Sequence, residues 1–252
     1  MPAYKPRTLP FALAALSLGA CSHHATHGHG HAHAARHGHG PAHGPHAGGA
    51  GHHAHGPDHF ADPAHFVAQW NDPARDAWQK PAEIIAAMGL QPGDTAVDVG
   101  AGTGYLLPVL SKAVGPSGQV LALDIEPAML AYLNRSVAEA GWTNVRVQAA
   151  KPSDPGLTAG SVHAAVTLNV WHHVDDRVAY AKQLLQGLRP GGSFVVVDFL
   201  KEQTEGFGPP LAMRLSAEQV LADLTAAGFV AEILPETMPR HYVVRGRRPV
   251  AP

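Results

Sequence analysis

Short apolar runs alternate with helical patterns along the last two thirds of the chain. The runs at 119–124, 161–168 and 193–199 are nearly continuous in apolar residues, which is typical of strands buried on both faces. Strands that alternate with helices favour a parallel sheet. We expect strands ending near 99 and at 119–124, 144–149, 161–168, 193–199, 229–234 and 241–245, and helices at 82–88, 105–114, 127–140, 176–187 and from 216 to about 228.

Three alternating glycines follow the first of these strands. The stretch 97–105 reads Val-Asp-Val-Gly-Ala-Gly-Thr-Gly-Tyr, so an apolar run ends in a carboxylate and leads through Gly100, Gly102 and Gly104 into a helical pattern. Glycine lets the backbone approach a ligand closely, and the free N–H groups at a helix start favour an anionic group. We therefore expect a small-ligand site at this turn.

A dinucleotide is the obvious rival ligand for a glycine-rich turn. The spacing here is Gly-x-Gly-x-Gly rather than Gly-x-Gly-x-x-Gly, because residue 105 is Tyr. Asp98 would repel a pyrophosphate and would suit a ligand with positive charge, such as an ammonium beside a sulfonium. Asp124 ends the next strand, where an acid accepts hydrogen bonds from ribose hydroxyls.

These motifs resemble those of the class I S-adenosylmethionine-dependent methyltransferases. The pattern from Asp98 to Gly104, the acid Asp124 and the turn Leu188–Gly192 are similar to three motifs of that family, and the resemblance covers about residues 75–247. It implies an α/β, Rossmann-like fold: a seven-stranded, mostly parallel sheet with helices on both faces and a terminal antiparallel hairpin. It also implies S-adenosyl-L-methionine as cofactor and a small-molecule methyl acceptor. Cofactor contacts are expected from Asp98, Gly100, Ala101, Gly102, Thr103, Gly104, Asp124, Ile125, Ser153, Asp154 and Asn169.

The chain departs from the family pattern at two positions. Ala149 and Ala150 follow the third strand where the family more often has an acid, so the adenine contact is assigned to Ser153 and Asp154 in the following loop. His163 stands in the fourth strand where the family commonly has Asp.

Two adjacent histidines follow the fourth strand, at the edge where reactive groups gather in an α/β sheet. His172 and His173 are the candidate catalytic bases, because an imidazole can take a proton from the methyl acceptor. Asp176 is a candidate to orient His173. The alternative is that one histidine only holds the loop by a hydrogen bond.

Residues in two further segments are candidates for the site. Arg75 and Trp78 precede the first motif, in a segment that folds over the cofactor in many class I methyltransferases, although a tryptophan packed on the sheet edge is an equal alternative. Phe207 and Met213 lie in the long loop after the fifth strand, where acceptor specificity is usually set.

The first 59 residues differ in composition from the rest. Residues 1–21 resemble a bacterial lipoprotein signal peptide, with Lys5 and Arg7 before an apolar stretch that is too short to span a bilayer, and with Cys21, the only cysteine, at the cleavage position. Residues 22–59 hold 14 of the 19 histidines and are expected to be a disordered linker. We expect residues 60–252 to form the methyltransferase domain.

The leader predicts a lipid-anchored, periplasm-facing location in a bacterial envelope, or the cytoplasm if the leader is not used. Histidines spaced two apart, such as His29, His31 and His33, are weak candidates for divalent metal binding. Because S-adenosylmethionine is made in the cytosol, two alternatives stay open. One is a non-catalytic ligand-binding module, and the other is a metal-handling envelope lipoprotein that uses the histidine tract.

Overall composition excludes several partners and acceptors. The net charge is −2 and 15% of residues are charged, so no broad basic surface indicates nucleic acid. A single cysteine at position 21 excludes a cysteine-dependent arsenite methyltransferase and any intramolecular disulfide.

Overall fold

The computed structural model describes residues 62–202 and 206–250. The predicted leader, the histidine-rich linker and the metal-ligand candidates His29, His31 and His33 lie outside these residues. Within the described part, no helix is both long and apolar enough to cross a membrane.

Seven strands form one sheet in the order β3-β2-β1-β4-β5-β7-β6. The first five pair in parallel, and β7 pairs antiparallel with both β5 and β6. The predicted mostly parallel sheet with a terminal antiparallel hairpin is therefore confirmed. The strands are β1 (Thr95–Val99), β2 (Gln119–Asp124), β3 (Val145–Ala149), β4 (Val162–Leu168), β5 (Leu188–Phe199), β6 (Val230–Leu234) and β7 (His241–Arg247).

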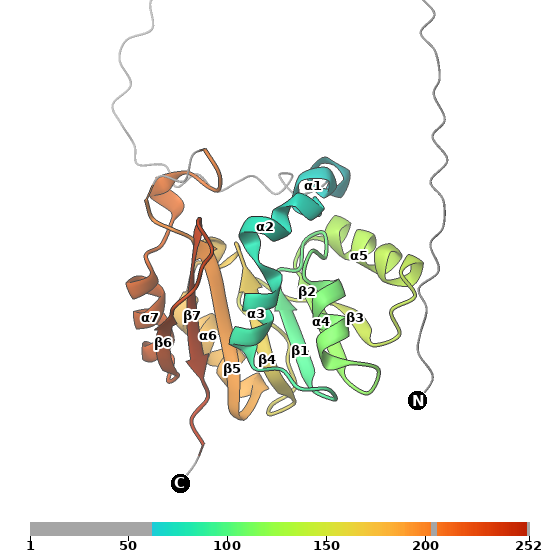
Figure 1. Ribbon diagram of the computed structural model, residues 1–252. Coiled ribbons are helices and arrows are strands. Elements are labelled where there is room, and N and C mark those ends of the chain that lie inside the picture. Colours follow the sequence, from blue (N-terminus) through green and yellow to red (C-terminus); the bar gives the residue numbers. More distant parts are fainter. Residues whose placement is uncertain (1–61, 203–205, 251–252) are drawn as a thin grey trace, which may run out of the picture. The chain divides into compact units, whose positions relative to one another are not determined.

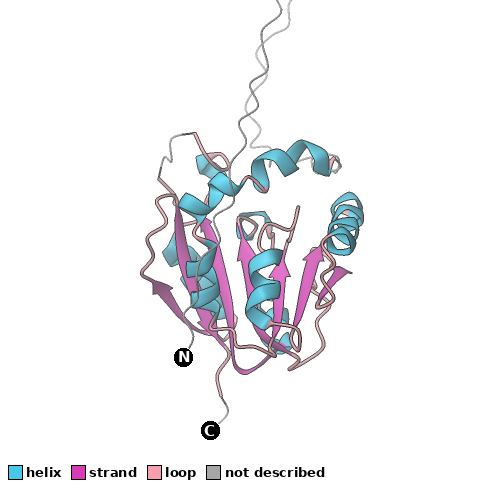
Figure 2. Cartoon of the chain, turned by 45° about the vertical axis from the view of Figure 1, so that its right-hand side comes forward, coloured by secondary structure: helices cyan, strands magenta, loops and turns pink. Residues whose placement is uncertain are grey.

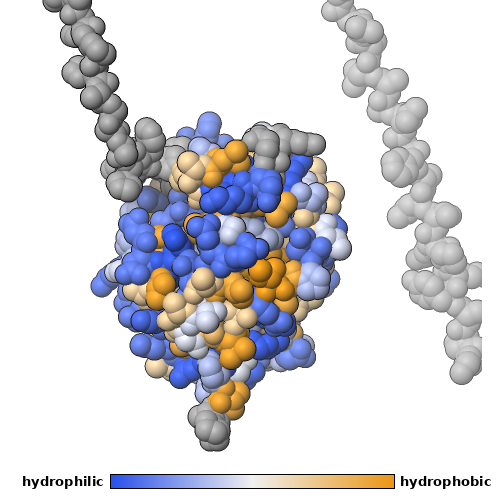
Figure 3. All heavy atoms as spheres, turned by 90° about the vertical axis from the view of Figure 1, so that its left-hand side faces the viewer, coloured by the Kyte–Doolittle hydropathy of each residue, from blue (hydrophilic) through white to orange (hydrophobic). Residues whose placement is uncertain are grey.

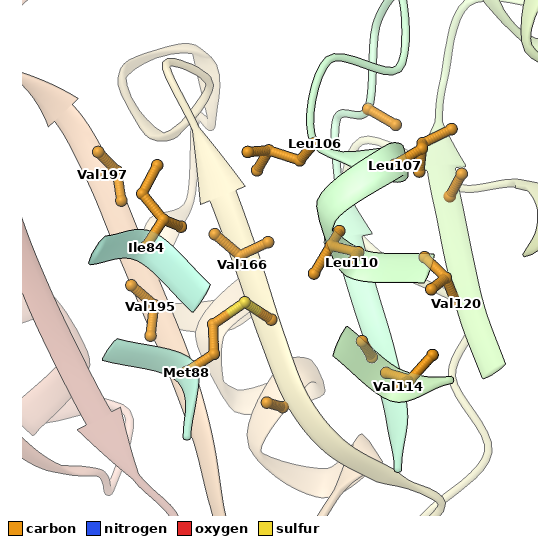
Figure 4. Close-up of a cluster of buried hydrophobic side chains, with 14 of the residues drawn as sticks. Ile84, Met88, Leu106, Leu107, Leu110, Val114, Val120, Val166, Val195 and Val197 are labelled. Carbon is orange, nitrogen blue, oxygen red and sulfur yellow. The ribbon is translucent and has the colours of Figure 1, made fainter. Parts of the chain in front are cut away.

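Helices cover both faces of the sheet (Figure 1). The helices after the N-terminal segment are α3 (Pro81–Met88), α4 (Leu107–Val114), α5 (Pro127–Glu139), α6 (Arg177–Gly187) and α7 (Ala217–Ala226). One hydrophobic cluster joins α3 and α4 to the sheet through Ile84, Met88 and Leu110, as Figure 4 shows. A second cluster packs Leu184 of α6 and Leu224 of α7 on the opposite face.

Local signals account for most helix boundaries. Pro127 is the first residue of α5, where its missing N–H costs nothing, and Pro108 likewise lies in the first turn of α4. The predicted capping box at the start of α7 is present, because Ser216 and Gln219 exchange side chain-to-backbone hydrogen bonds.

The structure differs from the sequence-based boundaries at two places. Strand β5 begins at Leu188 rather than Ser193, since Leu188 pairs with Val162 before a register shift in β4. The segment before α3 is also more ordered than expected. It contains α1 (Pro63–Trp70), the 3₁₀ turn η1 (Pro73–Arg75) and α2 (Asp76–Gln79). Two further 3₁₀ turns, η2 (Trp171–His173) and η3 (Leu211–Met213), follow β4 and β5.

The N-terminal segment lies across one end of the sheet. Figure 2 shows α1 and α2 beyond the arrowheads of the parallel strands, which is the carboxyl edge where ligands bind in open α/β sheets. Strand β6 forms one of the two lateral edges of the sheet. That strand exposes Val230 and Ile233, and Figure 3 shows apolar patches among hydrophilic surface on this side.

Candidate active site

Two carboxylates stand at the ends of neighbouring strands. Asp98 in β1 is 3% exposed and Asp124 at the end of β2 is 7% exposed. Burial, and then the charge of Asp124, raise the pKa of Asp98 to about 7, partly offset by Arg75. No group among the described residues donates a hydrogen bond to the Asp98 carboxyl. Since buried polar groups are normally paired, this carboxyl is poised to receive a cationic donor.

Asp124 has a different environment although its position is equivalent. One of its oxygens accepts a hydrogen bond from the N–H of Gly102 at 2.8 Å, and the other accepts from Glu126 at 3.0 Å. Burial raises its pKa, and these backbone donors oppose the rise. The backbone N–H of Ile125 is a third donor to this carboxylate, which still leaves acceptor capacity for a further donor such as a hydroxyl group. Asp124 therefore ties the glycine turn to β2 as well as offering a ligand contact.

The glycine turn has the backbone conformation that the spacing predicts. Gly100, Gly102 and Gly104 have φ values of 74°, 55° and 83°, which disfavour any residue with a Cβ. The close neighbours come from the protein itself. A Cβ added at Gly100 would lie 2.7 Å from the Val170 side chain, and one at Gly102 would lie 3.3 Å from the Trp70 ring. The glycines are thus needed for packing in addition to ligand approach.

The N-terminal segment is bonded to this turn. The Asn71 amide donates to the backbone oxygen of Thr103 at 2.9 Å and accepts from the Thr103 hydroxyl at 2.7 Å. Trp70 stacks on Phe66 of the same helix, with ring centroids 4.3 Å apart, and rests on Gly102. Helix α1 therefore covers the place where a ligand of Gly102 would lie.

A cavity of about 310 Å³ lies behind the turn, on the side of α4 and α5. Its lining includes Asn71, Thr103, Tyr105 and Tyr132. It does not include the residues at the ends of β4 and β5, so it is separate from the proton-transfer candidates described below.

The residues expected near the adenine are spread along the same edge. Ile125 is 49% exposed, which is unusual for an isoleucine directly after a buried strand and leaves an apolar surface beside Asp124. Ser153 is exposed, while Asp154 accepts a hydrogen bond from the N–H of Gly156 at 2.8 Å. His163, in contrast, lies at the opposite end of β4. Its Nδ1 accepts from the Thr95 N–H and its Nε2 lies 3.3 Å from Asp94.

The two candidate bases have unequal surroundings. The side chain of His172 in η2 is 3% exposed, and its Nδ1 lies 2.9 Å from both carboxylate oxygens of Asp198 in β5. His173 is exposed, and its ring centroid lies 4.2 Å from that of His172. Asp198 also accepts from the N–H of Phe199, so its orientation is fixed by β5. The structure thus brings one of the two histidines against a buried carboxylate.

Asp176, the candidate to orient His173, has a role at the start of a helix. The Asp176 carboxylate caps α6 by accepting from the Ala179 N–H at 3.0 Å. Short polar side chains commonly take this role at the start of a helix. Sequence reasoning missed Asp198, which is 26 residues away in the chain, because only the pairing of β4 with β5 brings it to the histidine loop.

Asn169 and His241 form a third feature of the same edge. Asn169 follows β4 in a left-handed conformation with φ of 59°, which asparagine tolerates better than most residues. Its Oδ1 lies 2.9 Å from Nε2 of His241, the fully buried first residue of β7. Burial lowers the pKa of His241 to about 3, with contributions from the charges of Arg75, Arg240 and Arg214. His241 is therefore neutral, and no pattern in the sequence indicated its role.

Comparisons with known proteins agree with this geometry. Residues 96–192 match a family described as "Methyltransferase domain". A solved S-adenosylmethionine-dependent methyltransferase from Aquifex aeolicus is 27% identical, with a TM-score of 0.69, and the match covers 74% of this chain and 98% of that one.

Two curated relatives are similar over shorter stretches. Nocamycin O-methyltransferase of Saccharothrix syringae is 30% identical over 63% of this chain and 54% of its own length. A ubiquinone/menaquinone biosynthesis C-methyltransferase of Pseudomonas fluorescens is 31% identical over 46% of each chain. This chain spans about half the length of these two relatives.

Residues 96–192 therefore match a methyltransferase domain, and they lie on the same fold as a solved S-adenosylmethionine-dependent methyltransferase. S-adenosylmethionine is the cofactor of this chain, and the site fits this molecule. The unpaired Asp98 carboxyl suits an ammonium, and Asp124 has lone pairs for hydroxyl groups. Trp70 would have to share or leave the space over Gly102 when a ligand binds there.

Proposed function

We propose that this chain transfers a methyl group from S-adenosylmethionine to a small-molecule acceptor, with His172 as the general base. The observation that carries the proposal is the buried, unpaired carboxyl of Asp98 beside the glycine turn. An ionised carboxylate in that position is costly unless a cation joins it, and the ammonium group of the cofactor is such a cation. The named activities of the two curated relatives support a small acceptor.

The proton-transfer role is assigned to His172 because of its partner. Nδ1–H of His172 donates to the Asp198 carboxyl, which fixes the tautomer and leaves Nε2 as the nitrogen that takes up a proton. When bound, S-adenosylmethionine supplies an electrophilic methyl group. The protein then has to hold the acceptor in line and remove its proton, so positioning and His172 carry the remaining chemistry.

Titration calorimetry of the full chain with S-adenosylmethionine and S-adenosylhomocysteine tests the cofactor site. Both ligands should bind, and Asp98→Asn should weaken S-adenosylmethionine about ten- to a hundredfold, the range of one charge-assisted hydrogen bond. NAD should give no heat, since Asp98 opposes a pyrophosphate. A folded chain that binds neither S-adenosylmethionine nor S-adenosylhomocysteine would overturn the proposal.

Methyl transfer itself is tested with methyl-labelled S-adenosylmethionine and a panel of small hydroxylated acids, phenols and quinols. Label should appear in at least one acceptor. The chain would be a binding module rather than an enzyme if the cofactor binds tightly and no member of the panel is labelled.

We further propose that Cys21 carries a lipid anchor and that residues 22–59 tether the domain to a membrane, with weak binding of divalent metals. The support is the sequence pattern of residues 1–59 alone. Intact-mass measurement after expression in a bacterium should show a lipidated chain beginning at Cys21, and a Cys21→Ser variant should keep residues 1–20. An unmodified chain beginning at Met1 would contradict the anchor.

A further inference from the structure

Five side chains from distant parts of the chain meet beside the His172 loop. We call them the Trp78 cluster: Trp78 of α2, Phe199 of β5, Phe207, Arg240 and His241. The His241 ring stacks on Trp78 with centroids 5.7 Å apart and an interplanar angle of 12°, and it lies 4.4 Å from Phe199. The Arg240 guanidinium carbon lies 3.5 Å from the Phe207 centroid and 4.8 Å from that of Trp78. The cluster is therefore a cationic group held between aromatic rings.

Two atoms of this cluster are buried without a partner. Nη1 of Arg240 and Nδ1 of His241 have no hydrogen-bond partner among the residues that the structure describes. His241 itself is fully buried. Among the described residues, Nε1 of Trp171 and the hydroxyl of Tyr242 are also buried without a partner. Buried polar atoms are nearly always paired in folded proteins, so the two unpaired atoms that lie in one cluster at the sheet edge indicate that a ligand supplies their partners.

The two unpaired atoms need opposite kinds of hydrogen-bond partner, because one is a donor and the other is an acceptor. Arg240 Nη1 is a charged donor and needs an acceptor, best an anionic oxygen. His241 is neutral and its Nε2–H donates to Asn169 Oδ1, so Nδ1 is an acceptor and needs a hydroxyl or N–H group. A molecule that carries both an anionic oxygen and a hydroxyl group satisfies the pair.

The nearby arginines make this end of the site electropositive, but they have other partners. Arg75 donates to the backbone oxygen of Trp70 and to Gln79. Arg214 donates to the backbone oxygens of Pro209 and Leu200, which holds the loop after β5. Arg240 is the one of the three with a buried N–H group that lacks a hydrogen bond within the described residues.

The cluster is linked directly to the proposed base. His241 bonds to Asn169, which leads through Val170 into the η2 turn that holds His172. Phe199, against which His241 packs, is the neighbour of Asp198 in β5. A ligand bound to the cluster would therefore lie at the same strand ends as His172 and Asp198.

We propose that Arg240 and His241 bind the methyl acceptor, and that this acceptor is an aromatic hydroxycarboxylate. Its carboxylate pairs with Arg240, one hydroxyl group donates to His241, and its ring packs against the aromatic side chains of the Trp78 cluster. This hydroxyl group anchors the acceptor, and the proton that His172 removes comes from a different group of the acceptor. This inference rests on the proposed methyltransferase function, because it names the substrate class of the same site.

The test uses the full chain saturated with S-adenosylhomocysteine, and the probes are the three positional isomers of hydroxybenzoate. Each isomer has two matched controls, the hydroxybenzamide without the charge and the methoxybenzoate without the hydroxyl hydrogen. At least one hydroxybenzoate should bind, as measured by calorimetry or ligand-detected NMR. It should bind about tenfold or more tightly than its amide, the range of a charge-assisted hydrogen bond.

Three variants separate the cluster from general charge effects. Arg240→Gln should weaken the hydroxybenzoate about tenfold or more and leave the amide unchanged. His241→Phe keeps a ring against Trp78, and it should remove the preference for hydroxybenzoate over methoxybenzoate. Arg247→Gln, an exposed arginine at the other end of β7, is the matched control and should change nothing. All three variants should bind S-adenosylhomocysteine like the unmodified chain, which shows that they are folded.

The outcomes distinguish the two proposals. If the chain binds S-adenosylhomocysteine but no hydroxybenzoate, the acceptor inference is wrong and the cofactor site stands. Equal losses in Arg240→Gln and Arg247→Gln would also overturn the inference. If hydroxybenzoate binds through Arg240 while neither S-adenosylmethionine nor S-adenosylhomocysteine binds, the cluster is a ligand site and the proposed methyl transfer fails.

Discussion

The two halves of the carboxyl edge are built from opposite charges. At the ends of β1 and β2 lie two buried carboxylates, Asp98 and Asp124. Around the ends of β4, β5 and β7 the arginines are close enough to depress the pKa of a histidine, and the carboxylate there, Asp198, is already paired. The first half suits a cationic ligand and the second half suits an anionic one. A methyl donor with a sulfonium and an acceptor with a negative charge would each be drawn to its own side.

The halves also differ in how the chain builds them. The half at the ends of β1 and β2, which we call the cofactor half, comes from two motifs, 98–104 and 124–126, and each is contiguous in sequence. The half around β4, β5 and β7, which we call the acceptor half, combines residues from α2, η2, β5, a loop and β7. The first can therefore be recognised by its spacing, whereas the second exists only after the sheet has formed. The following predictions test this comparison, beginning with the largest expected effect.

Replacing His172 should have the largest effect. His172→Asn should lower kcat for the best-labelled acceptor about 10²- to 10⁴-fold, the usual contribution of a general base, with little change in cofactor affinity. His173→Asn is the matched control and should cost less than about tenfold, because His173 is exposed and the buried carboxylate belongs to its neighbour. Steady-state kinetics with both variants decide which of the two histidines is the general base.

The opposite ranking would contradict the assignment of the base to His172. If neither variant loses more than a few-fold in kcat, the His172–Asp198 pair only holds the η2 turn. The Asp198→Asn variant adds a second readout, since a positioning role predicts a change in the pH profile of kcat as well as in its size.

The second prediction is a pH dependence of cofactor binding that Asp98 causes. Its pKa of about 7 in the free protein means that the carboxyl must lose a proton before it pairs with the ammonium group. Binding should therefore weaken as pH falls below 7, by about tenfold between pH 8 and pH 6, and should release a proton near pH 6. Calorimetry in buffers of different ionisation enthalpy measures both effects.

Asp98→Asn is the control for this pH dependence and should abolish it. The free variant should also be more stable than the unmodified chain at pH 8. The folded-state pKa of Asp98 is raised, so the buried carboxyl destabilises the fold as pH rises from about 4 through 7. Near pH 4 the thermal stabilities should converge. An unchanged pH dependence in the variant would assign the proton to another group, Asp124 first.

The smallest effect is expected from the cover over the glycine turn. Asn71→Ala removes two hydrogen bonds to Thr103 and should loosen α1, which raises the dissociation rate of S-adenosylhomocysteine about three- to tenfold. Stopped-flow fluorescence can follow this, because Trp70 rests on Gly102. Asn134→Ala is the control, since Asn134 is an exposed residue of α5 that bonds only within its helix. Equal rates in all three proteins would contradict a covering role for α1.

The sequence by itself determined the fold and the conformation of the glycine turn. Buried parallel strands need continuous apolar runs, which the sequence has at 119–124 and 161–168. A turn with three positive φ values needs glycine, which the sequence has within 100–104. Caps such as Ser216 with Gln219 are local for the same reason.

Only the tertiary structure decided that a buried carboxylate lies against His172 and which residues adjoin this pair. Asp198 reaches His172 because β4 and β5 pair in register, and His241 reaches Asn169 because β7 runs antiparallel to β5. Trp78 meets Arg240 across 162 positions of the chain, and no spacing rule acts over such a distance. Side chains that are brought together by strand pairing leave no local pattern, since each is constrained by its neighbours in space rather than by its neighbours in sequence.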